Sequence, residues 1–279
     1  MSFIEDFKGV FRKSENGLVR LIVINVLVFV IANVVDLFGD YFSSLFSLPF
    51  ELNVFISRFW SLFTYMFLHK ELFHILFNML WLYWMGKIFV DFMGSKRLVA
   101  VYLLGGVCGG LMFLLLGNLL WGNRTSVYLM GASASVMAVV IAIAVIVPNY
   151  VIHLMFFGPV RIKYIALVSF ILTSVIDLND NTGGKIAHIG GALFGLLYAV
   201  LYKRGTDLSA IITSFSKVFS AKGKMKVAYK RSATDEDYNA SKIQLQHKID
   251  EILDKISKSG YESLSKEEKE ILFKVSNQK

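Results

Sequence analysis

Apolar residues in this chain gather in long runs that are separated by short polar turns. Six of these runs approach the roughly 20 residues that a helix needs to cross a bilayer. We expect spanning helices at residues 19–38, 72–92, 97–117, 132–147, 162–178 and 186–202. The fourth run is short, which suits a helix that begins inside the protein and not at the lipid surface. The pattern therefore predicts an all-α polytopic membrane protein with six transmembrane helices.

The stretch between the first two runs has a different pattern. Residues 39–70 are rich in Phe and Leu, but Pro49, Glu51 and Arg58 interrupt them. Such a segment is too broken to span a bilayer, so it predicts short helices that lie at the membrane surface. His69, at the end of the segment, is expected at the same interface.

The composition changes after the last run. Residues 205–232 combine an apolar stripe with Lys and Arg, and they predict an amphipathic linker whose residues 222–231 face anionic lipid. Residues 233–279 are polar and predict a small cytoplasmic helical appendage, in which Ser265 and Glu268 have the spacing of a capping box. The predicted divisions are thus an N-terminal segment at 1–18, a six-helix domain at 19–204, the linker and the appendage.

Basic residues are concentrated in alternate connections. The chain carries a formal net charge of +8, and its Lys and Arg cluster before the first run and after the second, fourth and sixth. Because cytoplasmic loops are enriched in Lys and Arg, we expect both termini in the cytoplasm and the even-numbered spans running inward. Membrane topology thus explains the positive charge, and we expect no nucleic-acid partner.

Polar side chains inside the predicted spans are candidates for function, because they are costly in a bilayer. His74 and Asn78 are four residues apart, so both lie on one face of the second helix. By themselves they are more typical of hydrogen bonds that hold helices together. The fourth helix begins around Gly131, Ser133 and Ser135, small residues that alone indicate close packing.

The sixth predicted helix contains His188 among glycines. Gly184, Gly191 and Gly195 permit the close approach of another helix, and together with Gly131 they are expected to serve helix packing. A lone histidine in such a helix is usually structural or part of a proton path.

Considered together, these residues can form a catalytic site. A serine hydroxyl becomes a good nucleophile when a histidine accepts its proton, so Ser133 and His188 predict a dyad if the fourth and sixth helices touch. The Ser133 amide, His74 and Asn78 can then face the developing oxyanion. The sixth helix has no Asp or Glu placed to orient His188, so packing is expected to fix the imidazole. Because Cys and His show no metal-ligand spacing, we expect no cofactor.

Four motifs follow one another along the membrane part of the chain. They are HILFNMLWLYWMG from residue 74, YLLGGVCGG from 102, GASA from 131 and AHIGGALFG from 187. In this order they resemble the rhomboid family of intramembrane serine proteases, over roughly residues 20–202. The resemblance implies a six-helix rhomboid bundle of the bacterial type, located in the inner membrane. It also implies that Ser133 is the nucleophile and His188 the base, while His74, Asn78 and the Ser133 amide form the oxyanion hole.

Three positions depart from the family pattern. Ala134 replaces the usual glycine after the serine, and Trp60-Ser61 replaces a Trp-Arg pair. Met137 stands where an aromatic residue often packs on the histidine, although a thioether can still contact an imidazole. None of these changes removes a reacting group, so we expect them to affect rate and substrate preference.

The resemblance implies cleavage of single-span membrane proteins near the outer end of their transmembrane helix. Residues that weaken a helix are expected near the cut, because they unwind cheaply. A catalytically silent relative that binds membrane clients is the first alternative, and it would be expected to lack Ser133 or His188. A transporter is the second, but the spans show neither paired charged residues nor an inverted repeat.

Overall fold

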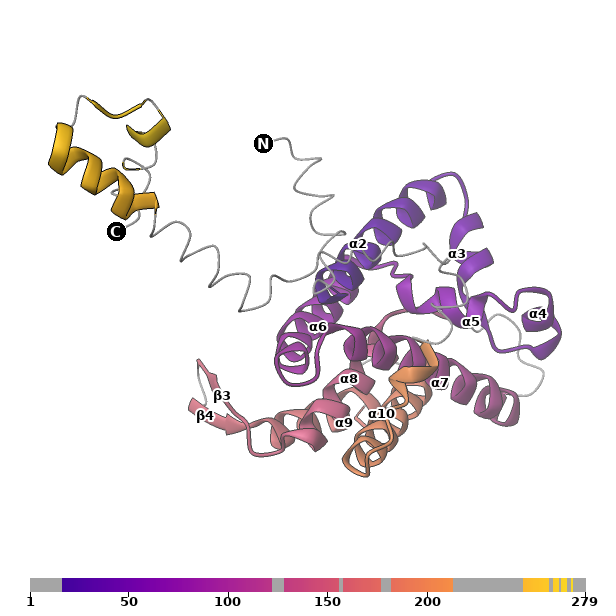
Figure 1. Ribbon diagram of the computed structural model, residues 1–279. Coiled ribbons are helices and arrows are strands. Elements are labelled where there is room, and N and C mark those ends of the chain that lie inside the picture. Colours follow the sequence, from indigo (N-terminus) through magenta and orange to yellow (C-terminus); the bar gives the residue numbers. More distant parts are fainter. Residues whose placement is uncertain are drawn as a thin grey trace. The chain divides into compact units, whose positions relative to one another are not determined.

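The computed structural model shows a bundle of apolar helices, and it describes residues 17–121, 128–155, 158–176, 182–212, 248–260, 263–265, 267–269 and 272. Four helices in these ranges are long and apolar enough to cross a membrane: α2 (Gly17–Asp36), α6 (Leu72–Met93), α7 (Ser95–Trp121) and α10 (Thr182–Lys203). Two shorter apolar helices, α8 (Ser133–Ile146) and α9 (Ile162–Ser174), join them (Figure 1). The prediction of an all-α membrane protein is confirmed.

The centre of the bundle is formed by α7, α8 and α10, which pack directly on one another. Ten of the 14 residues of α8 are buried. Glycines let the helix backbones come close together. A Cβ on Gly191 would lie 2.9 Å from the Ala134 carbonyl carbon, and one on Gly195 would lie 3.0 Å from the Ala138 Cα. A larger residue at either position of α10 would therefore push α8 away.

Between α2 and α6 the chain forms short elements and no spanning helix. They are α3 (Tyr41–Phe46), β1 (Leu48–Pro49), α4 (Leu52–Ser57), α5 (Ser61–Thr64) and the 3-10 helix η1 (Tyr65–Phe67). The Asp36 carboxylate at the end of α2 accepts hydrogen bonds from the amides of Phe42 (2.9 Å) and Ser43 (3.3 Å), which caps α3. Asn118 of α7 donates to the Phe50 carbonyl at 2.6 Å. These bonds fasten the segment to α2 and α7.

Two short antiparallel strand pairs complete the described membrane part. β1 pairs with β2 (Tyr128–Leu129), and Leu48 lies opposite Leu129. β3 (Val151–Leu154) and β4 (Gly158–Arg161) form a hairpin that connects α8 to α9 and extends away from the bundle (Figure 1). The hydrophobic pattern did not predict either pair, because strands of two to four residues leave too short a periodic signal.

Residues Lys222–Lys279 form a separate compact unit. A helix covers residues 248–259, and Ile252 and Leu264 are buried. The predicted capping box is confirmed, because the Ser265 amide donates to Glu268 at 2.7 Å and the Glu268 amide donates to Ser265 Oγ at 3.3 Å. Most of the predicted N-terminal segment (1–18) and of the predicted basic linker (205–232) lies outside the described residues.

Candidate active site

Ser133 occupies the first position of α8, directly after a bend in the chain. The bend is at Gly131, whose φ of 125° lies in the region that favours glycine. Ala132 is the N-cap, so the Ser133 amide belongs to the first turn, where amides lack intrahelical partners and carry partial positive charge. Ser133 is half-buried. Its backbone amide is therefore suited to stabilise a negatively charged oxygen.

Contacts from the segment before α6 hold the loop that leads into α8 (residues 128–132). In addition to the β1–β2 pairing, the Gly131 amide donates to the Tyr65 carbonyl at 3.0 Å, and the Ala132 amide donates to Nε2 of His69 at 3.2 Å. His69 is only 1% exposed. Sequence reasoning missed this role of His69, because its partner is a backbone amide 63 residues away.

His74 and Asn78 lie on α6, and His74 borders the same loop. A Cβ on Gly131 would lie 2.8 Å from Cε1 of the His74 ring and 3.8 Å from Ser133 Oγ, so the imidazole and the hydroxyl flank one glycine. The rings of His69 and His74 meet edge to face, with centroids 5.1 Å apart. Asn78 is buried, and its amide donates to the His74 carbonyl at 2.8 Å. This bond uses one of the two N–H donors of the amide.

His188 lies on α10 and is oriented by a backbone carbonyl. Its Nδ1 is 3.0 Å from the carbonyl oxygen of Thr173. Thr173 is in the last turn of α9, where carbonyls have no intrahelical partner. We expected packing to fix this imidazole, and the hydrogen bond to the Thr173 carbonyl holds it in addition. When Nδ1 donates its proton to Thr173, Nε2 is the ring nitrogen that can accept one.

Small residues bring together the segments that carry the serine and the histidine. A Cβ on Gly109 of α7 would lie 2.6 Å from the Ala134 Cβ and 2.8 Å from the Ala187 carbonyl oxygen. Ala134 directly follows Ser133, and Ala187 directly precedes His188. The three central helices thus meet beside both polar side chains.

The segments that carry the serine and the histidine meet at Gly109, without a hydrogen bond between the two side chains in the described residues. Within the described ranges, no hydrogen bond joins Ser133 to His188, and Nδ1 of His188 contacts the Thr173 carbonyl. In enzymes without substrate, catalytic hydrogen bonds are often long and shorten only when substrate binds. The contacts at Gly131 and Gly109 bring together the segments of α6, α8 and α10 that carry these polar groups.

Ser135, the second serine of α8, has a different environment. It is fully buried, and its Oγ donates to Sδ of Met66 at 3.7 Å. A hydroxyl enclosed in this way offers no room for a substrate carbonyl. In the part of the chain that the structure describes, no three His, Cys, Asp or Glu side chains gather into a group that could hold a metal ion.

The burial of His69 predicts a loss of stability in acid. Burial lowers the pKa of His69 to about 3, and the neighbouring His74 acts in the same direction. In an unfolded chain the imidazole of His69 has its ordinary pKa of about 6.5. Between about pH 3 and about pH 6.5 the unfolded chain therefore binds more protons than the folded chain. The free energy of unfolding therefore rises with pH across this range, and above about pH 6.5 His69 no longer reduces it. At about pH 5 the expected loss from this group is about 2 kcal/mol.

Thermal unfolding of the detergent-solubilised protein, from about pH 7.5 to about pH 5, measures this effect. His69→Gln is the matched variant, because a glutamine oxygen can accept from the Ala132 amide but does not titrate. We expect the variant to lose less stability in acid than the wild type. An equal loss in both proteins would show that His69 does not carry the effect.

Two parts of the chain match known protein families. Residues 57–205 match the Rhomboid domain, and residues 233–278 match a family of unknown function, DUF6576. No match is found among curated proteins. The first match covers more than half of the chain and includes the helices that carry Ser133 and His188. Proteins with this domain are typically serine intramembrane proteases, and some are inactive relatives. The chain belongs to the rhomboid family.

Proposed function

We propose that this protein is an intramembrane serine endopeptidase in which Ser133 and His188 form a catalytic dyad. The observation that carries the proposal is the contact of Gly109 with both Ala134 and Ala187, the residues next to the serine and the histidine. The family match supports it, because rhomboid proteins are typically serine proteases of the membrane.

The reaction begins when Ser133 Oγ attacks a peptide carbonyl carbon. His188 Nε2 accepts the hydroxyl proton, while Nδ1 stays bound to the Thr173 carbonyl. The imidazolium then gives that proton to the leaving amine as the C–N bond breaks. A water molecule, deprotonated by the same nitrogen, hydrolyses the acyl-enzyme and frees the serine. Each step uses only these side chains and water.

Negative charge develops on the carbonyl oxygen during the attack, and we assign three groups to stabilise it. They are the Ser133 amide at the N-terminus of α8, the His74 ring beside Gly131 and the side-chain amide of Asn78. Loss of one donor from an oxyanion hole typically costs about 3–4 kcal/mol of transition-state stabilisation.

The substrates that we propose are single-span membrane proteins, cut near the outer end of their transmembrane helix. Helical hydrogen bonds shield a peptide bond, so Gly or Pro near the cut favours cleavage. We place both termini of this multi-pass protein in the cytoplasm of a bacterium, with the helices in the inner membrane. The alternation of Lys and Arg along the chain supports this orientation, and the basic residues at 222–231 support contact with anionic lipid.

Labelling by a serine-reactive phosphonate tests the proposal, because only an activated serine reacts readily. We expect mass spectrometry to find the label on Ser133 of the detergent-solubilised protein. Ser133→Ala and His188→Ala should not be labelled, whereas Ser135→Ala should react like the wild type. Absence of label from the folded wild-type protein would favour a catalytically silent relative that binds membrane clients.

A further inference from the structure

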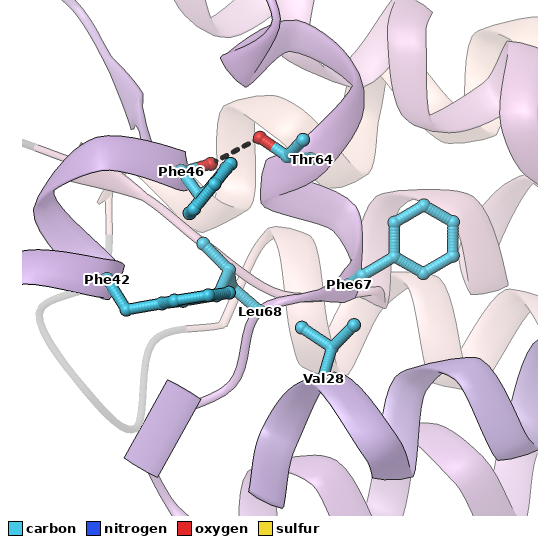
Figure 2. A pocket seen from close by; sticks show the side chains of 6 residues that line it. All are labelled: Val28, Phe42, Phe46, Thr64, Phe67 and Leu68. Carbon is cyan, nitrogen blue, oxygen red and sulfur yellow. Dashed lines mark hydrogen bonds between the residues drawn. The ribbon is translucent and has the colours of Figure 1, made fainter. Parts of the chain in front are cut away.

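An apolar hollow of about 210 Å³ lies between α2 and the short elements that follow it. Its lining consists of Val28, Phe42, Phe46, Thr64, Phe67 and Leu68 (Figure 2). The rings of Phe42 and Phe46 lie 4.6 Å apart on α3, and the Asp36 carboxylate fixes this helix by capping its first turn. The side of the hollow that α3 forms is therefore held in place.

The side chains that line the hollow favour an apolar ligand. Thr64 has the single polar side chain of the lining, and its Oγ1 already donates to the Phe46 carbonyl at 2.7 Å (Figure 2). The other lining side chains are aliphatic or aromatic. A hollow of this kind does not hold ordered water, since a bound water needs two or more polar partners.

The surface around the hollow is apolar as well. α2 is a candidate membrane span, and its residues Ile24 and Ile31, one turn before and one turn after Val28, are 37% and 51% exposed. The surface of α2 on this side therefore offers a hydrocarbon chain an apolar approach. Lys70, two residues after Leu68, has a half-exposed side chain and forms an ion pair with Asp40 at 2.5 Å. An ammonium has three N–H donors, so it can also bind a lipid phosphate.

We propose that this hollow binds one acyl chain of a membrane phospholipid, from the leaflet at the Ser133 end of the bundle. The contacts of Tyr65 and His69 with residues 131 and 132 identify that end. A bound acyl chain fills the space between α2 and α3. It thereby stabilises the segment between α2 and α6, which holds the loop before Ser133. The proposal does not depend on whether Ser133 is catalytic.

Photo-crosslinking in vesicles tests the acyl-chain site. The full-length protein is reconstituted in phosphatidylglycerol with a small fraction of phosphatidylcholine that carries a diazirine in its acyl chain. After irradiation, mass spectrometry of the peptides locates the cross-links. We expect several-fold more label at Val28, Phe42 and Phe67 than at Val30, on the exposed side of the same helix. Equal labelling would show ordinary contact with bulk lipid and overturn the proposal.

Three variants of α2 make the test more specific. Val28→Phe fills the hollow, and we expect it to reduce labelling of Phe42 and Phe67 several-fold. Val30→Phe is the matched control, because it makes the same change on the exposed side of α2 and should leave labelling unchanged. Val28→Leu repeats the test with a smaller addition in case the first variant does not fold. Undiminished labelling in a folded Val28 variant overturns the proposal. Displacement of the label by a single-span substrate also overturns it, because the hollow would then bind a polypeptide.

Discussion

Alanine in place of Ser133 or His188 is expected to reduce cleavage of a single-span membrane substrate by about a thousandfold or more. The first change removes the proposed nucleophile, and the second removes the proposed base, whose Nδ1 contacts the Thr173 carbonyl. Because the two residues act as a unit, the double variant should cleave about as slowly as either single variant. Gel-based cleavage of a purified substrate in proteoliposomes measures this loss.

Ser135→Ala is the matched control for the nucleophile. The Ser135 hydroxyl is buried against Met66, so we expect this variant to cleave at close to the wild-type rate. Thermal unfolding of every variant separates a loss of catalysis from a loss of fold. Equal cleavage by the wild type, Ser133→Ala and His188→Ala would refute the dyad. Loss of cleavage in Ser135→Ala alone would assign the reaction to the other serine.

A single methyl group on Gly191 is expected to lower cleavage by about a hundredfold. The added Cβ of Gly191→Ala would lie 2.9 Å from the Ala134 carbonyl carbon and closer still to its oxygen. These are backbone atoms of a packed helix, so α10 must move away from α8 and carry His188 away from Ser133. Displacement of reacting groups by about 1 Å can cost about a hundredfold in rate, and overpacking typically destabilises by about 1–3 kcal/mol.

Gly183→Ala is the matched control for this contact, because it makes the same change in the same helix. Its new Cβ would lie 2.9 Å from the ring of Phe113, which is a side chain that can tilt. We expect Gly183→Ala to cleave within a few-fold of the wild type. Cleavage and thermal unfolding are measured on both glycine variants. Similar cleavage by the two would contradict the role inferred for the contact between α8 and α10.

The hydrophobic pattern located the helices because bilayer thickness and apolar run length are linked. The fourth run was predicted at 132–147, and α8 covers Ser133–Ile146. One error arose where a helix begins with residues that are not apolar. α10 begins at Thr182, four residues before the predicted start, and its first turn contains Gly183, which packs on Phe113 but adds no hydrophobic signal.

The side chains of the candidate site could be named from sequence, because polar residues are rare inside apolar runs. Ser133 and His188 stand out for this reason. The groups that position them could not be named. Thr173 and Tyr65 act through backbone carbonyls, which every residue has, so no residue type marks them. His69 was visible, but its contact depends on a loop that only the tertiary fold brings to it.

α8 is too short to join the two aqueous phases. Its 14 residues extend about 21 Å, whereas the hydrocarbon layer is about 30 Å thick. The Lys203 ammonium donates to the Val145 carbonyl at 2.7 Å, and a lysine head group stays near the polar boundary. With that end anchored, the hydroxyl at the other end lies roughly 10 Å beneath the opposite boundary. In the reaction that we propose, a scissile bond must therefore descend to meet this hydroxyl, and water must follow through a passage that the protein itself provides.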